Sequence, residues 1–211
     1  MRDEDFEILA RETVFRGYFR VERLTCRHRR HDGGWTEPYR REVFERGHAV
    51  AVLPYDPTAD RVVLIEQLRP PVALAGLPVR QLEIVAGIIE PGETPEAVAG
   101  RELQEESGLA AGELRFLFRH LPSPGCSSET IRVYLALVDA SAAGGHHGLA
   151  EEHEEIRVLA LPAQEAFRLV AEGRIENATA LLALQWLQLH HAALRHPPGP
   201  PAGLQAQPLP R

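Results

Sequence analysis

Three glutamates at helical spacing are the residues of this chain that best fit a chemical role. Glu102, Glu105 and Glu106 stand at positions i, i+3 and i+4, so a helix would place their carboxylates on one face. Like charges at this spacing destabilise an isolated helix by about 0.2–0.5 kcal/mol per pair. A bound cation would offset that repulsion, and carboxylate oxygens suit Mg²⁺ or Mn²⁺. The pattern therefore indicates metal-assisted phosphate chemistry; the alternative is an exposed acidic helix face.

Local signals define the helix that would carry these glutamates. Thr94 is a suitable N-cap, Pro95 fits the first helical position, and Gly108 can end the helix in the left-handed conformation. Glu93 precedes the helix, where the dipole favours a negative charge. Arg101 is expected to pair with Glu93 or with a neighbouring carboxylate. The sequence thus predicts a strand, a loop, an acidic helix and a second loop in that order.

The elements that must position this helix follow from the hydrophobic pattern. Strands are expected at Phe6–Leu9, Val14–Leu24, Arg40–Phe44, Ala49–Pro54, Val62–Gln67, Gln81–Ala86, Leu114–His120, Thr130–Val138 and Val158–Leu161. Two later helices are expected at Glu165–Glu172 and Ala178–His190. The order predicts an α/β protein, an α/β/α sandwich with a mixed sheet, preceded by a small N-terminal β-rich segment.

Length and composition suggest three parts. The chain has 211 residues, and 44% of them are hydrophobic, which fits one main domain with extensions. We expect a β-rich segment over 1–45, the main domain over 46–195, and a disordered proline-rich tail over 196–211. The first part buries too little surface to be stable alone, so it should pack on the main domain or on another chain.

Charge and apolar patterning exclude several protein classes. The net charge of −7 argues against a nucleic-acid partner, because such proteins usually carry a basic stripe. No signal peptide follows Met1, and no apolar run approaches 18 residues, so no membrane association is expected. Cys26 and Cys126 lack the CxxC spacing, which predicts free thiols in a reducing compartment. We therefore expect a cytoplasmic protein.

The acidic segment resembles the Nudix box at every defined position of that motif. Its residues in this sequence are Gly87, Glu93, Arg101-Glu102-Leu103, Glu105-Glu106 and Gly108-Leu109. In Nudix enzymes, glutamates of the box hold divalent metal ions that bridge a diphosphate, and water attacks one phosphorus. The resemblance therefore implies the Nudix fold and a pyrophosphatase activity.

The same resemblance implies a set of metal ligands. Glu102 and Glu106 would be the principal ligands, with Glu105 and the main-chain carbonyl of Ala86 completing the set. Arg101 would organise the site through an ion pair with the first glutamate of the box, and it is counted with Glu106 among the catalytic residues. Mg²⁺ is the expected cofactor, with Mn²⁺ as the alternative.

Further segments, up to about residue 195, resemble the bacterial ADP-ribose pyrophosphatase branch of the Nudix family. A proline, Pro124, stands fifteen residues beyond Leu109, as in ADP-ribose-specific members. By this resemblance Arg69 would bind the substrate phosphates. Ser123 and Glu129 would contact the terminal ribose.

The N-terminal segment mixes aromatic and arginine side chains, which suits stacking on a nucleobase. The alternative is an ordinary hairpin with exposed arginines. The branch resemblance implies a homodimer with a shared adenine pocket. In it, Tyr18 would stack on adenine opposite Arg41 of the partner subunit.

The segment GLAEEHEEIRV (148–158) resembles the loop that supplies the catalytic base in this branch. By alignment Glu152 would accept the proton of the attacking water, with Glu154 as the substitute. The alternative is an acidic surface loop without a catalytic role. The nearby histidines (146, 147 and 153) lack the spacing that would complete a tetrahedral zinc site.

The expected reaction is Mg²⁺-dependent hydrolysis of ADP-ribose to AMP and ribose 5-phosphate. One alternative is a pyrophosphatase for GDP-mannose or another nucleotide sugar, which would use the same metal helix. The other is a Nudix-fold regulator that binds ADP-ribose without cleaving it. Such a regulator usually loses box carboxylates, and this chain retains all of them.

Overall fold

The structure is a computed structural model that describes residues 4–149 and 154–195. The strands are β1 (Phe6–Arg16), β2 (Arg20–His28), β3 (Tyr39–Glu45), β4 (Ala49–Asp56), β5 (Arg61–Leu68), β6 (Arg80–Glu83), β7 (Val85–Ile88), β8 (Glu113–His120), β9 (Ile131–Leu137), β10 (His146–His147) and β11 (Ile156–Pro162). The α-helices are α1 (Pro95–Ser107), α2 (Ala163–Ala171) and α3 (Ala178–Arg195). Two short 3₁₀ helices are η1 (Pro70–Ala75) and η2 (Ala140–Ala142).

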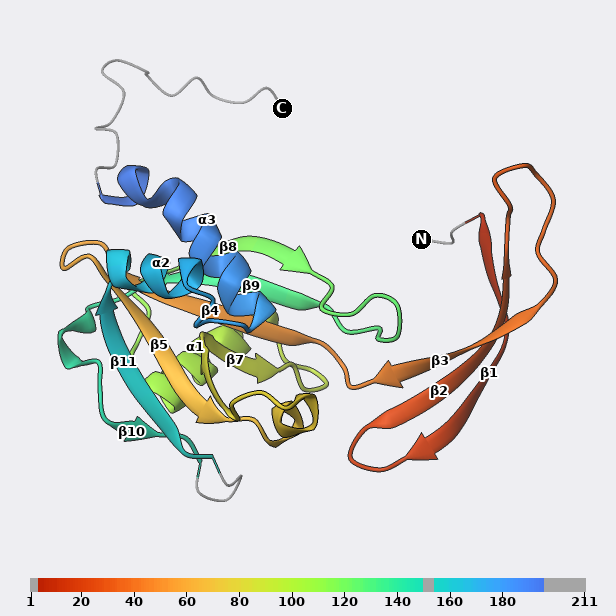
Figure 1. Ribbon diagram of the computed structural model, residues 1–211, viewed down its shortest axis with the longest axis horizontal. Coiled ribbons are helices and arrows are strands. Elements are labelled where there is room, and N and C mark those ends of the chain that lie inside the picture. Colours follow the sequence, from red (N-terminus) through yellow and green to blue (C-terminus); the bar gives the residue numbers. More distant parts are fainter. Residues whose placement is uncertain (1–3, 150–153, 196–211) are drawn as a thin grey trace, which may run out of the picture.

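The main body is built on an eight-stranded sheet (Figure 1). Six strands follow the order β10-β11-β5-β4-β9-β8, while β6 pairs with β5 and β7 pairs with β4. β4 and β9 run parallel, and the neighbouring pairs β4·β5, β5·β11 and β8·β9 run antiparallel. The sheet is therefore mixed, as predicted.

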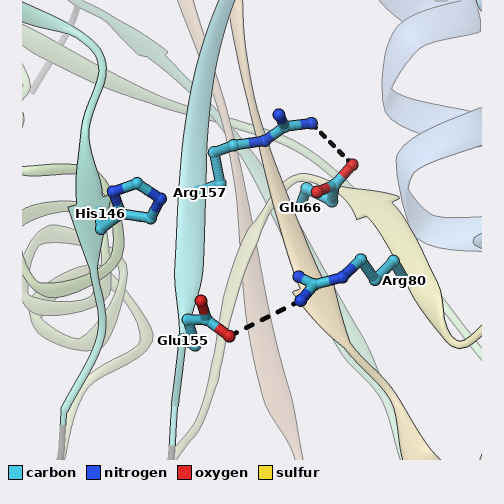
Figure 2. A pocket seen from close by; sticks show the side chains of 5 residues that line it. All are labelled: Glu66, Arg80, His146, Glu155 and Arg157. Carbon is cyan, nitrogen blue, oxygen red and sulfur yellow. Dashed lines mark hydrogen bonds and ion pairs between the residues drawn. The ribbon is translucent and has the colours of Figure 1, made fainter.

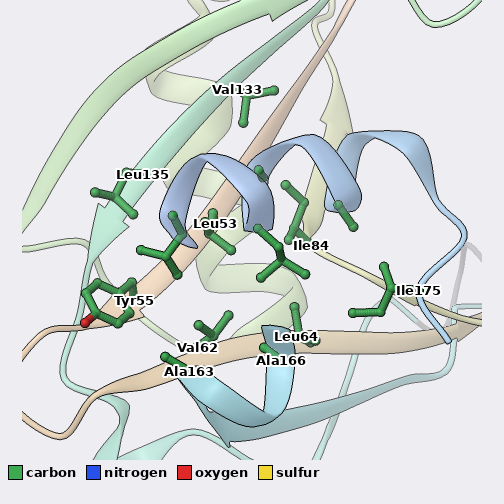
Figure 3. Close-up of a cluster of buried hydrophobic side chains, with 14 of the residues drawn as sticks. Leu53, Tyr55, Val62, Leu64, Ile84, Val133, Leu135, Ala163, Ala166 and Ile175 are labelled. Carbon is green, nitrogen blue, oxygen red and sulfur yellow. The ribbon is translucent and has the colours of Figure 1, made fainter. Parts of the chain in front are cut away.

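Side chains of β4 alternate between two cores. Leu53 and Tyr55 pack with residues of α2 and α3 on one face (Figure 3). Val50 and Val52 pack on the other face with Leu103 of α1. This alternation follows from the two-residue period of a strand, and it places helices on both faces of the sheet. The predicted α/β/α sandwich is confirmed.

Helix α1 has the bounds that its local signals predict. The Thr94 hydroxyl oxygen accepts a hydrogen bond from the Ala97 N–H at 3.3 Å. At the other end Gly108 has φ 71° and donates its N–H to the Gln104 carbonyl at 2.9 Å. Leu103 is fully buried, and burying such a side chain is worth about 1.5–3 kcal/mol. Caps and packing together fix the direction of the acidic face.

Three predicted strands are wrong in their extent. The strand expected at Phe6–Leu9 continues to Arg16 as β1. The stretch Val14–Leu24 is divided by a turn in which the Gly17 N–H donates to the Phe19 carbonyl at 2.9 Å. The stretch Gln81–Ala86 is divided at the buried Ile84, because β6 pairs with β5 whereas β7 pairs with β4.

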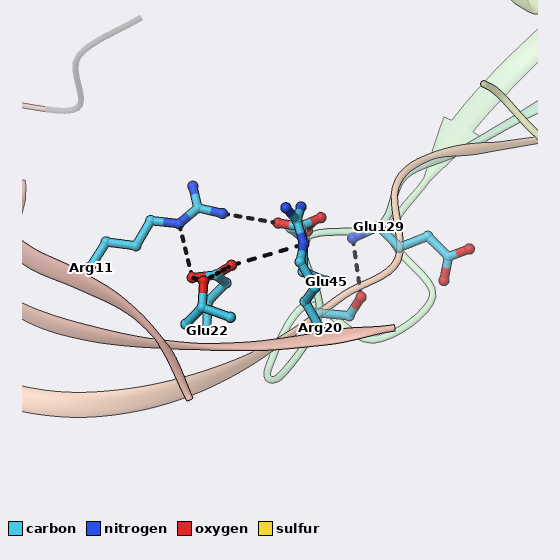
Figure 4. Close-up of polar contacts among 8 residues, drawn as sticks. Arg11, Arg20, Glu22, Glu45 and Glu129 are labelled. Atoms are coloured by element: carbon cyan, nitrogen blue, oxygen red, sulfur yellow. Dashed lines mark hydrogen bonds and ion pairs between the residues drawn. The ribbon is translucent and has the colours of Figure 1, made fainter. Parts of the chain in front are cut away.

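The N-terminal strands β1, β2 and β3 form a separate antiparallel sheet that projects from the sandwich (Figure 1). A buried carboxylate, Glu22 of β2, contacts side chains of β1 in this sheet (Figure 4). It accepts a hydrogen bond from the Thr13 hydroxyl at 3.0 Å and lies 3.4 Å from the Arg11 guanidinium. The division of the chain at residue 45 stays a prediction, and the proposed tail at 196–211 lies outside the described residues.

Both cysteines are free thiols; Cys26 is buried and Cys126 is exposed. Within the described ranges, every helix is too short or too polar to cross a lipid bilayer.

Candidate active site

The last turn of α1 places one carboxylate inside the protein. Glu106 is 3% exposed, and its Oε2 accepts a hydrogen bond from the Ala86 N–H in β7 at 3.0 Å. Burial, reinforced by the neighbouring carboxylates of Glu102 and Glu154, raises the pKa of Glu106 to about 8. A nearby cation would favour the ionised form of such a carboxylate.

Glu102 approaches the backbone at a glycine. A Cβ built on Gly87 would lie 1.8 Å from Oε1 of Glu102, a distance that no real Cβ atom can occupy. Glycine at this position therefore makes room for the carboxylate. Burial is the main cause that raises the pKa of Glu102 to about 7.

Arg101 contacts three glutamates of the motif. Its Nη1 lies 2.9 Å from Oε2 of Glu105 and 3.0 Å from Oε1 of Glu102. Its Nε lies 3.5 Å from Oε1 of Glu93. Both pairings expected for Arg101 are therefore present, and the guanidinium partly neutralises the acidic face of α1.

The donor chemistry of this region fits a hard divalent cation. The candidate ligands are carboxylates and a main-chain carbonyl, which are the oxygen donors that Mg²⁺ and Mn²⁺ prefer. Ala86 gives its N–H to Glu106 rather than to β4, so its carbonyl also faces away from β4. The close approach of Glu102 to Gly87 and the hydrogen bond of Glu106 to the Ala86 N–H bring these oxygens to one region.

The candidate carboxylates are not arranged as a complete metal-coordination site. Among residues 4–149 and 154–195, no three His, Cys, Asp or Glu side chains converge closely enough to hold an ion. Glu102 and Glu105 are both paired with the Arg101 guanidinium instead. Ion binding would exchange some of those contacts for metal–oxygen bonds.

We predict that removing divalent cations makes stability depend on pH through Glu106. Its pKa in the folded state, about 8, lies above 4.5, the ordinary value of the side chain. The stabilisation from the bound proton is thus complete below the unfolded-state pKa and is lost as pH rises through the folded-state pKa. In EDTA, the urea midpoint should fall between about pH 5 and pH 8, and it should fall less for Glu106→Gln. A urea midpoint that falls equally with pH in wild-type protein and in Glu106→Gln would contradict this prediction.

Arg69 follows β5 directly and forms a two-point ion pair with Glu83 of β6. Nε and Nη2 donate to the two carboxylate oxygens at 3.1 and 3.0 Å. Burial lowers the pKa of Arg69, but the carboxylates of Glu83, Glu106 and Glu154 together raise it above its usual value. The guanidinium proposed to hold phosphate therefore lies close to the acidic region of α1.

The loop expected to supply the base adjoins the same region. Glu152 lies outside the described residues. Glu154 donates its N–H to the Leu149 carbonyl at 3.2 Å, and its carboxylate raises the pKa values of both Glu102 and Glu106. The structure thus brings Glu154 toward the candidate metal ligands.

Two ion pairs lie where this loop meets the sheet (Figure 2). Arg157 of β11 donates to Glu66 of β5 at 2.9 Å, and Arg80 of β6 lies 3.8 Å from Glu155. Together with His146 they line a cavity of about 280 Å³. Each pair contains an exposed arginine, so each contributes little to stability.

The candidate ribose contacts lie in the loop before β9. Glu129 is buried, and its Oε1 lies 3.5 Å from Nε of Arg46. The Ser123 hydroxyl lies 3.1 Å from the thiol of Cys126. The Cys126 carbonyl in turn accepts the Phe44 N–H of β3 at 2.7 Å, so this loop is attached to the N-terminal sheet.

The two candidate adenine contacts are not brought together within one chain. Tyr18 stands in the turn between β1 and β2 and is 88% exposed. Arg41 lies on β3 opposite Leu24 of β2, and its guanidinium stands 4.6 Å from the ring centre of Tyr39. An adenine pocket made from both residues would need a second subunit.

Sequence reasoning missed one polar side chain of this region. Gln67 of β5 is buried, and its Nε2 has no hydrogen-bond partner in the part of the chain that the structure describes. The alternation of side chains along β5 could have indicated Gln67, because Gln67 and Arg69 lie on the same face as Val63 and Ile65.

The chain is similar to known proteins along most of its length. The model of the NUDIX domain matches residues 45–201. The chain is 47% identical over 192 residues to the ADP-ribose pyrophosphatase of Escherichia coli strain K12, covering 91% of this chain and 92% of that protein. It is 33% identical over 185 residues to the GDP-mannose pyrophosphatase of Enterobacter sp. strain 638, covering 87% of this chain and 95% of that one.

A solved structure agrees with these similarities. The crystal structure of an ADP compounds hydrolase matches with a TM-score of 0.66 at 25% sequence identity, covering 89% of this chain and 96% of that chain. The shared fold and the intact glutamate motif on α1 support the same assignment. The chain belongs to the Nudix family.

Proposed function

We propose that this protein is a Mg²⁺-dependent pyrophosphatase that hydrolyses ADP-ribose to AMP and ribose 5-phosphate. The observation that carries the proposal is its 47% identity to an ADP-ribose pyrophosphatase over nearly the full length of both chains. All glutamates of the metal motif are present, which weighs against a regulator that only binds the nucleotide.

In the proposed reaction the candidate site residues have separate roles. Glu102, Glu105, Glu106 and the Ala86 carbonyl would hold Mg²⁺, with Mn²⁺ as the alternative. Held by these residues, a divalent cation would supply positive charge against the diphosphate and would lower the pKa of the attacking water. Arg69 binds a phosphate through charge-assisted hydrogen bonds.

The remaining roles concern the proton and the two ends of the substrate. Glu152, or Glu154 in its place, accepts a proton from the attacking water. Ser123 and Glu129 contact the terminal ribose. We place the activity in the cytoplasm, where free thiols such as those of both cysteines persist.

Product analysis on a panel of diphosphates tests this proposal. ADP-ribose, GDP-mannose and dinucleoside polyphosphates are incubated separately with Mg²⁺, and the products are separated by chromatography. We expect ADP-ribose to have the highest kcat/KM and to give equal amounts of AMP and ribose 5-phosphate. Faster cleavage of GDP-mannose would favour that second substrate. Intact ADP-ribose after long incubation with Mg²⁺ would favour a binding protein.

We further propose that the active form is a homodimer joined through the N-terminal sheet. β1 is an edge strand of that sheet, and it exposes large apolar side chains. These are Phe6, Ile8, Leu9 and Phe15. Exposed apolar surface on an edge strand is a usual site of pairing with another chain. The shared adenine pocket further requires that this pairing place Arg41 of the partner subunit beside Tyr18.

Light scattering tests the dimer directly. At micromolar concentration we expect a mass twice the 23.4 kDa of one chain. Replacing Ile8 and Phe15 by serine should shift the mass toward the monomer and weaken substrate binding, because both exposed side chains lie on β1. A wild-type mass of one chain would contradict the shared pocket.

A further inference from the structure

Gln67 carries a buried hydrogen-bond donor without an acceptor. Gln67 lies in β5 and is only 5% exposed, and among residues 4–149 and 154–195 its Nε2 has no hydrogen-bond partner. Buried polar atoms nearly always have a partner, so each exception in a native structure calls for an explanation. Its facing residue provides a contrast: Gln81 of β6 is similarly buried, yet its Nε2 donates to the Pro78 carbonyl at 2.6 Å.

The register of the sheet places Gln67 between two charged groups. Ile65 lies opposite Glu83, and Gln67 lies opposite Gln81. Gln67 and Glu83 are therefore diagonal neighbours on one face, a separation that long side chains can bridge. Arg69 follows two residues after Gln67 on the same face, and its guanidinium reaches Glu83.

The ion pair of Arg69 creates a difficulty for substrate binding. Both Nε and Nη2 of Arg69 are used on the two oxygens of Glu83. A phosphate that takes this same edge of the guanidinium would deprive Glu83 of its donors. The Glu83 side chain is 7% exposed, so water could not replace them, and a buried carboxylate without a partner is costly.

We propose that Gln67 is a positioning residue, whose amide donates to the Glu83 carboxylate in place of Arg69 when Arg69 binds the substrate phosphate. In the free protein Arg69 donates to Glu83, and the Gln67 amide has no acceptor. In the substrate complex Arg69 donates to phosphate, and Nε2 of Gln67 donates to the Glu83 carboxylate. The free energy spent on the unpartnered donor in the free protein is thus recovered on binding.

This inference rests on the proposed function only in that Arg69 holds a diphosphate, so the test uses the diphosphate that wild-type protein cleaves best. Gln67→Met keeps the length of the side chain and removes the donor, and Gln67→Leu is a second apolar replacement. Gln81→Met is the matched control, because it removes an amide that is already paired. Full-length variants are compared by thermal unfolding and by steady-state kinetics with Mg²⁺.

For Gln67→Met we expect the KM to rise about tenfold, the size of one hydrogen bond to a charged group, with kcat within about twofold. Its Tm should not fall, because the lost donor has no partner in the free protein. Gln81→Met should lower the Tm and leave the KM unchanged. In a Glu83→Gln background, Gln67→Met should no longer raise the KM, because no buried charge is left to satisfy.

Three results would overturn the inference. A KM of Gln67→Met within twofold of wild type would mean that phosphate binds the free Nη1 side and that Glu83 never loses Arg69. A fall in Tm like that of Gln81→Met, with unchanged KM, would make Gln67 a purely structural residue. If Gln67→Met raises the KM as much in the Glu83→Gln background as in wild-type protein, Gln67 does not act through Glu83. Wild-type protein inactive on every diphosphate would instead refute the proposed function itself.

Discussion

Glu106→Gln should reduce kcat/KM for ADP-ribose in Mg²⁺ by about 1000-fold or more, which corresponds to the several kcal/mol that a catalytic metal ion supplies. Glu106 is buried and accepts a hydrogen bond from the Ala86 N–H, which fixes the position of its carboxylate. Glutamine has nearly the same shape, and its carbonyl oxygen can still accept the Ala86 N–H. The substitution therefore removes the charge of one candidate ligand and preserves the packing of α1.

An exposed glutamate provides the control for this substitution. Glu113→Gln on β8 makes the same chemical change at an exposed ion pair with Arg115, and its kcat/KM should stay within about twofold of wild type. In EDTA the Tm of Glu106→Gln should not fall, because a carboxyl with a pKa raised by burial is costly to ionise. More than a tenth of wild-type activity in Glu106→Gln would refute its role as a ligand.

Gly87→Ala should reduce kcat/KM by about 100-fold, because misplacing a catalytic group by about 1 Å has effects of that size. The added Cβ would lie 1.8 Å from Oε1 and 2.0 Å from the carboxyl carbon of Glu102. Glu102 must therefore leave its position over β7, and the candidate ligand set loses its geometry. The core is not involved, so the fold should be retained.

Gly100→Ala is the matched control for that change. Gly100 lies within α1 and is exposed, and a Cβ built on it meets no described atom within 4 Å apart from its chain neighbours and the backbone of its own helix. Alanine there should stabilise the protein by about 0.5–1 kcal/mol through helix propensity and leave the kinetics unchanged. Equal activity of Gly87→Ala and Gly100→Ala would show that the contact between Gly87 and Glu102 does not matter for catalysis.

The acidic helix was predictable because its determinants are local. Thr94, Pro95 and Gly108 act within a few residues of the helix ends, and each does in the structure what its residue type favours. The face of α1 that carries Glu102 and Glu106 follows from the helical period alone. The sandwich was predictable for the same reason, since buried strands and later helices have different periods.

Features that depend on pairing between distant segments were not predictable in this way. The break at Ile84 exists because its two flanking strands pair with different neighbours, and a local strand pattern contains no record of its partners. Likewise, the close approach of Glu102 to Gly87 and the unpartnered amide of Gln67 arise only when separate elements are packed together.

Binding of Mn²⁺ to the full-length protein, followed by electron paramagnetic resonance, tests most directly whether the carboxylates of α1 hold the catalytic cation. We expect saturable binding to wild-type protein and strongly weakened binding to Glu106→Gln, with Glu113→Gln behaving as wild type. Equal Mn²⁺ affinity of wild-type protein and Glu106→Gln would contradict the account.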